Sequence, residues 1–302
     1  TGRVIEGRLA ETTVQPVALV ALVLLTRAAI GDRLRADTAM ALTLAAAGMA
    51  AAVSLALTRR SVPAAVRQAP PRHEEGVWWR SLRPLFVLSV IAVVHAQITI
   101  VMVGALTDVT ASGVFNAALK WAGFVSFAQV VLVYPLGPAL ARLRAEDDRA
   151  RAQRLLSASA AVGTAAAVPI AVLLVVFNRQ VLGVFGPSFT SGGRALTILA
   201  AGEVVNVACG GVAIALVVAH RERVVAVVSA VGLGATVVLG FVLIPRYGLE
   251  GAAVSRAVAV AGGNVALLWQ LHRREGVYAG ALGRRLLRPG RTPDSAERSS
   301  SG

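Results

Sequence analysis

Cysteine and charge are both scarce in this sequence. Cys209 is its one cysteine and lies inside an apolar run. A single cysteine excludes an internal disulfide, and Cys209 lacks the neighbouring ligands of a zinc site, so we interpret it as a small packing residue. Charged residues make up 15% of the 302 residues, against roughly 25% in soluble domains. Since 56% of the residues are hydrophobic, the composition argues against a water-soluble globule.

Long apolar runs take up most of the chain. They are separated by charged or Gly/Pro-containing breaks, and each is long enough to cross a hydrocarbon core of ~30 Å as a helix. We therefore predict an all-α integral membrane protein with about eight transmembrane helices. The predicted spans are residues 14–30, 38–57, 84–106, 112–132, 155–177, 195–219, 224–244 and 249–271. Residues 178–194 contain the apolar segment 181–189, which is too short and too interrupted to cross, and this predicts an interfacial segment.

Two segments outside the spans have a distinct composition. Residues 58–83 contain three prolines, six arginines and the pair Trp78-Trp79, which predicts a linker ending at the membrane interface. From residue 291 onward the chain consists of Ser, Pro and charged residues, which predicts a disordered end.

The formal charge of +14 comes mostly from arginine, since Lys120 is the one lysine. The arginines lie in loops beside apolar spans, which fits an anionic membrane surface better than nucleic acid, so no nucleic-acid partner is expected. If the N-terminus is cytoplasmic, 22 basic residues fall on the cytoplasmic side and 6 on the other. This asymmetry predicts that both termini are cytoplasmic.

The predicted loops contain few residues of the kinds that form catalytic or ligand-binding sites. They lack carboxylate pairs, Ser/His/Asp sets and a phosphate-binding glycine loop, so we expect no enzyme, no cofactor and no metal. The acidic residues of segment 144–149 are mixed with arginines, which indicates a solvated surface patch. A membrane-embedded glycosyl or acyl transferase would need an acidic or histidine catalytic loop, and none is found.

Three charged residues lie inside predicted spans and well away from the span ends: Lys120, Glu203 and Arg256. Placing a charged side chain at the centre of a membrane-spanning helix costs at least ~2.5 kcal/mol, so we expect each of these residues to have a structural or functional role. Their offsets from the span starts place all three roughly 10 to 12 Å below the outer surface. One interpretation is a hydrated, net-positive cavity for an anionic headgroup. The other is an ion pair of Glu203 with either cation, acting as structural glue.

Helical spacing adds neighbours to these charges. Asn116 shares a face with Lys120, and Asn206 shares one with Glu203. The predicted substrate-binding residues are therefore Lys120, Arg256, Asn116, Glu203 and Asn206. His95 and Gln129 are weaker candidates, because a lone polar residue in a span is more often a hydrogen-bonded packing residue.

Three segments resemble stretches of the polysaccharide flippases. Residues 113–120, GVFNAALK, resemble their G-x-Y-x-x-A-x-K/R stretch, and residues 182–189, LGVFGPSF, resemble L-x-x-F-G-x-x-F. Residues 244–253, IPRYGLEGAA, resemble I-P-x-x-G-x-x-G-A-A. In their order and spacing these segments resemble the polysaccharide branch of the multidrug/oligosaccharidyl-lipid/polysaccharide exporter superfamily, that is, flippases of the O-antigen and exopolysaccharide type.

The resemblance implies a two-lobed fold and a division of this chain. Residues 1–57 would be a partial N-lobe of two helices, residues 58–83 a cytoplasmic linker, residues 84–271 a six-helix C-lobe, and residues 272–302 a basic cytoplasmic tail. About four N-lobe helices would then be missing. Two positions depart from the family: Thr99 stands near a position that is often acidic, and Phe115 replaces a common tyrosine.

The resemblance also implies a function. The expected protein lies in the bacterial inner membrane and flips a polyprenyl-pyrophosphate-linked oligosaccharide across it by alternating access, for polysaccharide biosynthesis. Its partners would be that anionic lipid-linked oligosaccharide, the phospholipid bilayer, and a polysaccharide polymerase or chain-length machinery. Two alternatives stay open: a drug or peptidoglycan-precursor exporter of the same superfamily, and a truncated membrane scaffold that transports nothing.

Overall fold

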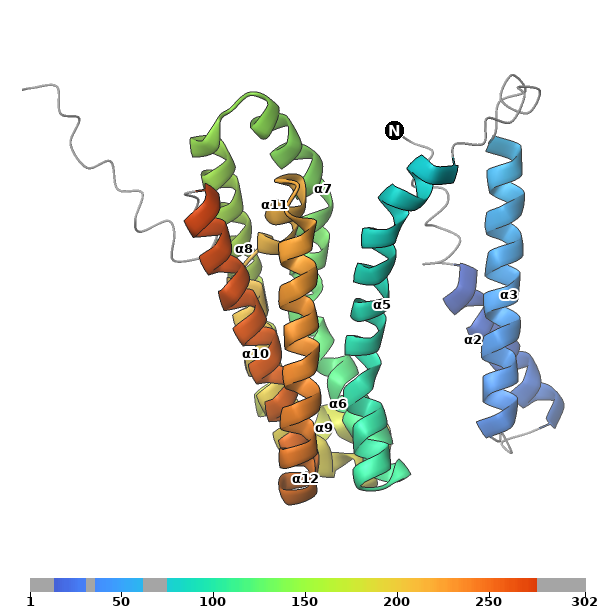
Figure 1. The fold of residues 1–302 in the computed structure, drawn as a ribbon. Coiled ribbons are helices and arrows are strands. Elements are labelled where there is room, and N and C mark those ends of the chain that lie inside the picture. Colours follow the sequence, from blue (N-terminus) through green and yellow to red (C-terminus); the bar gives the residue numbers. More distant parts are fainter. Residues whose placement is uncertain (1–13, 31–35, 62–74, 276–302) are drawn as a thin grey trace, which may run out of the picture. The chain divides into compact units, whose positions relative to one another are not determined.

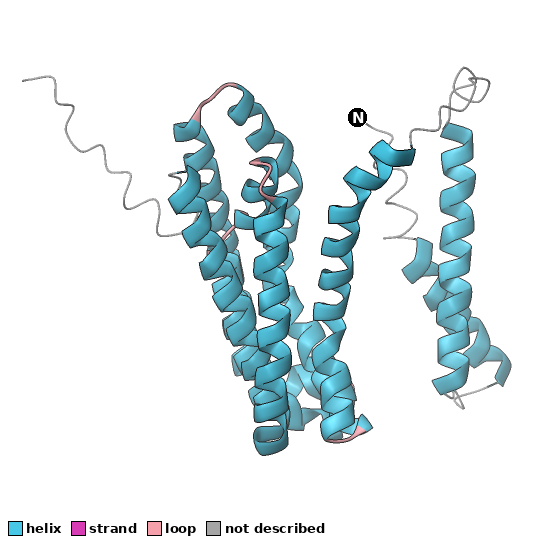
Figure 2. Ribbon diagram, viewed as in Figure 1, coloured by secondary structure: helices cyan, strands magenta, loops and turns pink. Residues whose placement is uncertain are grey.

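The computed structural model describes residues 14–30, 36–61 and 75–275. Within these ranges every regular element is a helix and no strand occurs (Figure 2). The chain divides into unit 1, within residues 1–74, and unit 2, within residues 75–302. The all-α fold class predicted from the sequence is confirmed for the described residues.

Six helical segments of the described part are long and apolar enough to cross a membrane. One of them, Glu222–Arg273, contains the seventh and eighth predicted spans together. The first predicted span corresponds to a shorter apolar stretch, Pro16–Thr26. The structure is thus compatible with an all-α membrane protein, and the number of eight spans stays a prediction.

Unit 1 consists of two helices that pack on each other, α2 (Gln15–Ile30) and α3 (Ala36–Ser61) (Figure 1). The buried side chains are small: Ala18, Ala46 and Ala50. Small residues allow two helix backbones to approach closely, which is how helices associate in a membrane without a hydrophobic driving force.

Unit 2 is a bundle of helices connected by short turns (Figure 1). Helix α5 begins at Glu75, before the predicted end of the linker at residue 83. The two short elements α9 and η3 fill the segment predicted to be too short to cross. The elements are α5 (Glu75–Leu106), α6 (Val109–Gly123), η2 (Phe124–Ser126), α7 (Phe127–Ala145), α8 (Arg149–Val176), α9 (Asn178–Gly183), η3 (Pro187–Gly192), α10 (Gly193–Ala208), α11 (Val212–Val218) and α12 (Glu222–Glu275).

Aspartates begin two of these helices. The Asp108 carboxylate accepts a hydrogen bond of 2.8 Å from the backbone N–H of Ala111 at the start of α6. Asp148 accepts one of 2.9 Å from the N–H of Arg151 at the start of α8. Each bond satisfies a backbone donor that has no partner in the first helical turn.

Helix α12 is a hairpin of two legs, which agrees with the gap between the predicted spans 224–244 and 249–271. The chain turns at Gly248, which has φ 55° and ψ −127°, a conformation that glycine adopts without a Cβ clash. Beyond the turn a Cβ at Gly251 would lie 2.2 Å from the carbonyl oxygen of Leu243, so only glycine fits there. The legs remain in register further along, because a Cβ at Gly263 would contact Val228 at 3.9 Å.

Two of the predicted spans are interrupted. The fourth passes from α6 through the 3₁₀ turn η2 into α7. The sixth is interrupted between α10 and α11, where Gly210 has φ 69°. Each region is still a single membrane-span candidate, Val109–Ala145 and Pro187–Val218, and the sequence did not predict the turn inside it.

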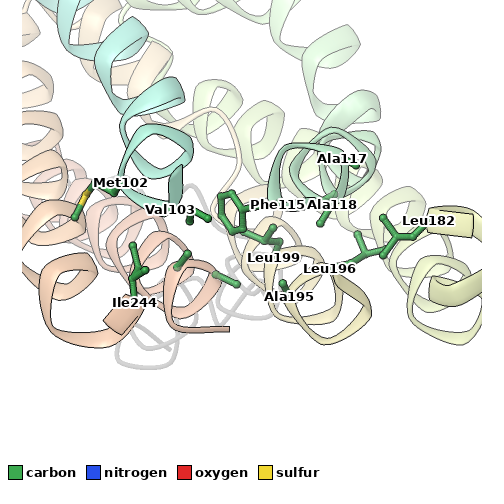
Figure 3. Close-up of a cluster of buried hydrophobic side chains, with 13 residues drawn as sticks. Met102, Val103, Phe115, Ala117, Ala118, Leu182, Ala195, Leu196, Leu199 and Ile244 are labelled. Carbon is green, nitrogen blue, oxygen red and sulfur yellow. The ribbon is translucent and has the colours of Figure 1, made fainter. Parts of the chain in front are cut away.

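One large hydrophobic cluster lies where α5, α6, α10 and α12 meet (Figure 3). Phe115 is fully buried in it, beside Val103 and Leu199. A Cβ at Gly240 would lie 2.7 Å from Cε of Met102, so α12 and α5 are in close contact here. The burial of Phe115 fixes the rotation of α6 and turns Lys120 outward, since residues five apart lie on different faces of a helix.

Candidate functional site

The carboxylate of Glu203 is held by two neutral donors. Glu203 lies on α10 and is partly buried. Its Oε2 accepts hydrogen bonds from Oγ of Ser126 and, at 2.9 Å, from Nδ2 of Asn206. Because Ser126 belongs to the 3₁₀ turn between α6 and α7, the acid is bonded to one of the two helix breaks.

The same chain of hydrogen bonds continues to α12. Asn264, on the second leg, donates from Nδ2 to Oδ1 of Asn206 at 2.8 Å and to the carbonyl of Val260 at 3.1 Å. The polar chain Ser126–Glu203–Asn206–Asn264 therefore joins three elements: η2, α10 and α12. In an apolar surrounding such bonds are retained because their alternative is an unsatisfied polar group.

A second group of polar contacts joins α5 to both legs of α12. Nη1 of Arg256 donates to the backbone carbonyl of His95 at 3.0 Å. The ring of His95 is bonded through Nε2 to Oγ1 of Thr236 at 3.2 Å. Thr236 is fully buried and also donates to the carbonyl of Gly232 at 3.0 Å.

Arg256 and Glu203 lie within electrostatic range of each other, yet neither belongs to an ion pair within the described residues. The glue interpretation predicted such a pair, and the structure instead gives each charge neutral hydrogen-bond partners. An unpaired ionisable group inside a membrane marks a functional position more often than a structural one.

The second helix break also carries a polar contact. The side chain of Gln129 on α7 donates from Nε2 to the backbone carbonyl of Gly210 at 3.1 Å. This carbonyl lies at the interruption between α10 and α11. A freed backbone carbonyl at membrane depth needs such a partner, which explains why Gln129 lies within an apolar helix.

A groove of about 190 Å³ opens beside these contacts, between α5 and the two legs of α12. Its polar lining residues are His95, Ser229 and Asn264, and Gly232 and Gly263 lie on its walls. The groove thus reaches both polar groups, one through His95 and the other through Asn264. It has the few placed polar groups of a ligand site but is smaller than most small-molecule pockets.

The structure brings together three of the five predicted site residues: Glu203, Asn206 and Arg256. Lys120 is exposed on α6, and Asn116 on the same helix is partly buried. Among the described residues neither side chain forms a hydrogen bond or an ion pair. Lys120 is therefore a separate exposed cation and does not belong to the polar chain.

Sequence reasoning missed Ser126, Thr236 and Asn264. Asn264 carried a usable signal, because an asparagine within an apolar span costs free energy unless it is bonded. Ser126 and Thr236 carried none, since serine and threonine in a helix commonly bond to a carbonyl of the preceding turn, as Thr236 also does. Only the tertiary arrangement shows that both also reach another helix.

In the described residues no cluster of three or more His, Cys, Asp or Glu side chains could hold a metal ion. No family model, no curated protein and no solved structure matches the chain. The site must therefore be interpreted from its own chemistry, together with the resemblance of its sequence motifs.

Proposed function

We propose that this protein is a membrane transporter of the polysaccharide-flippase type, which moves a polyprenyl-pyrophosphate-linked oligosaccharide across the inner membrane of a bacterium. The observation that supports this best is the position of the polar chain. Glu203 is bonded to one helix break, and Gln129 is bonded to the other. Interrupted helices with polar groups at their breaks are typical of transporter binding sites.

The charges suit an anionic substrate. Arg256 has five N–H donors, and among the described residues one hydrogen bond of its side chain is found, to His95. Its remaining donors are available to a pyrophosphate, which a planar guanidinium binds through two parallel bonds. Lys120, exposed on α6, supplies a second positive charge that attracts the substrate without a fixed geometry.

Glu203 would adjust the field of these cations or carry a coupling proton. Its carboxylate accepts from Ser126 and Asn206 when ionised, and in the protonated form it could instead donate one hydrogen bond. Because its neighbours are on η2 and α10, a change of its protonation alters the bond across the α6–α7 break. That is the kind of local change that biases an alternating-access equilibrium.

The experiment is a set of point variants in the chromosomal gene, with surface polysaccharide as the readout. Lys120→Ala should abolish surface polysaccharide without lowering the amount of protein in the membrane, because the side chain has no partner within the described residues. Arg194→Gln is the matched control, since it removes an exposed cation paired with Glu250 at 3.3 Å. Unchanged polysaccharide in the Lys120→Ala strain would remove this lysine from the mechanism.

A further inference from the structure

A second cavity lies at the end of unit 2 where α7, α8, α11 and α12 terminate. Its volume is about 310 Å³, at the lower end of the range of small-molecule sites. It shares no lining residue with the groove beside the polar chain and no residue with the chain itself. The lining residues come from the end of α7, the following turn, the start of α8, α11 and the end of α12.

The walls of the cavity are apolar and its rim is charged. Leu140, Leu156 and Leu271 are buried members of the hydrophobic cluster beneath it. The charged lining residues are Arg144, Asp147, Asp148 and Arg149. Since α7 and α8 are membrane-span candidates up to Ala145 and from Arg149, the charged rim lies at the border between hydrocarbon and water. A site of this form suits an amphiphile from the membrane.

The charges of the rim are balanced. Nε of Arg149 lies 3.5 Å from Oδ1 of Asp147, and both side chains are largely exposed. Asp148 pairs with Arg151 at 3.4 Å. Two arginines and two aspartates therefore border the cavity, which fits a headgroup that carries a phosphate and an amine next to each other better than one that carries a phosphate alone.

We infer that this cavity binds the phosphoethanolamine headgroup of a membrane phospholipid. The phosphate lies against Arg144 and Arg149, the ammonium donates to the carboxylates of Asp147 and Asp148, and the acyl chains leave along the leucine-lined wall. The inference does not depend on the proposed transport, because it concerns a different site and its test measures lipid binding alone.

The turn that carries the carboxylates is tightly built. Asp147 has φ 51°, a left-handed conformation that aspartate and asparagine tolerate better than other side chains. The backbone N–H of Asp148 donates to the carbonyl of Leu143 at 2.9 Å, which closes the turn. Asp147→Asn therefore keeps the backbone and removes the charge, whereas Asp148 must be kept because it begins α8.

Native mass spectrometry of the full chain in detergent tests the inference, with phosphatidylethanolamine, phosphatidylcholine and phosphatidylglycerol of identical acyl chains as probes. Phosphatidylcholine has the same net charge as phosphatidylethanolamine but no N–H donor. We expect wild-type protein to bind phosphatidylethanolamine between about threefold and tenfold more tightly than either of the others. The inference would be overturned if phosphatidylcholine or phosphatidylglycerol bound as tightly as phosphatidylethanolamine.

Two variants locate the preference. Asp147→Asn should abolish the preference for phosphatidylethanolamine over phosphatidylcholine, and Arg149→Gln should weaken the binding of all three lipids. Arg194→Gln, at the opposite end of the unit, is the control and should bind like wild type. A preference that persists in Asp147→Asn, or that is lost in Arg194→Gln, would place the lipid elsewhere and overturn the inference.

Discussion

The guanidinium of Arg256 donates a hydrogen bond of 3.0 Å to the backbone carbonyl of His95 and thereby joins the second leg of α12 to α5. The carboxylate of Glu203 is close enough to act on it electrostatically but is bonded to Ser126 and Asn206. A cation that is bonded to a neutral carbonyl, with a carboxylate nearby, can exchange partners when an anion enters.

Replacing Arg256 separates function from stability. Arg256→Met keeps the length and apolar body of the side chain and removes the charge. Because burying a charge is costly, we expect the free energy of unfolding to change by no more than about 1 kcal/mol, while transport falls at least tenfold. Unfolding in lipid nanodiscs and surface polysaccharide in cells measure the two effects. Wild-type transport by Arg256→Met would contradict the role given to this residue.

The bond between Asn206 and Asn264 should be measurable by a double-mutant cycle. We expect the two alanine variants to be coupled by between about 0.5 and 1.7 kcal/mol, the range found for hydrogen bonds between helices in a membrane. The control pair is Asn264 with Asn178, which lies on α9 and is bonded to the carbonyl of Val175. That pair should be additive, and additivity of Asn206 with Asn264 would mean that their bond contributes nothing.

Three glycine-to-alanine variants in the α12 hairpin should differ in their effect on the free energy of unfolding. Gly251→Ala should lower the free energy of unfolding by about 2–3 kcal/mol, because its methyl group would meet the carbonyl of Leu243. Gly248→Ala should cost about 1–2 kcal/mol, because its φ is positive. Gly262→Ala is the control, since no atom lies within 4 Å of its Cβ position. A loss of stability in this control equal to that of Gly251→Ala would contradict the packing described.

Because Cys209 is the one cysteine, labelling of cysteines introduced at chosen positions can measure the orientation of the chain in the membrane. Cys209 is 4% exposed and should react slowly with a maleimide. In right-side-out vesicles a membrane-impermeant maleimide should label Thr110→Cys, exposed in the first turn of α6, at once. Asp147→Cys, at the arginine-rich end, should be labelled only after permeabilisation. The reverse pattern would contradict cytoplasmic termini.

Sequence patterns predicted the helices well, because each long apolar run has one low-energy solution in a membrane. The corner at Gly248 was also predictable, since Pro245 and Gly248 interrupt the apolar run. The break at Phe124–Ser126 was not, because no proline or glycine lies within those three residues. Their conformation depends on tertiary contacts, among them the bond of Ser126 to Glu203.

The candidate site was predicted in part. Glu203, Asn206 and Arg256 were found because polar residues in apolar helices are costly. Sequence spacing on straight helices could not tell that Glu203 is bonded to neutral groups, or that Arg256 reaches a backbone carbonyl on α5. Partners from other helices depend on how those helices are rotated about their axes, and this is set by packing such as that of Phe115.

The sidedness of the lipid-linked oligosaccharide in the membrane tests the central claim most directly. In right-side-out vesicles, a membrane-impermeant glycosidase should cleave radiolabelled lipid-linked oligosaccharide from cells with the wild-type gene. In vesicles from deletion cells or Arg256→Met cells, the glycosidase should not cleave the lipid-linked oligosaccharide, because this lipid stays on the cytoplasmic side. Equal cleavage in the wild-type and deletion vesicles would show that the protein does not move this lipid.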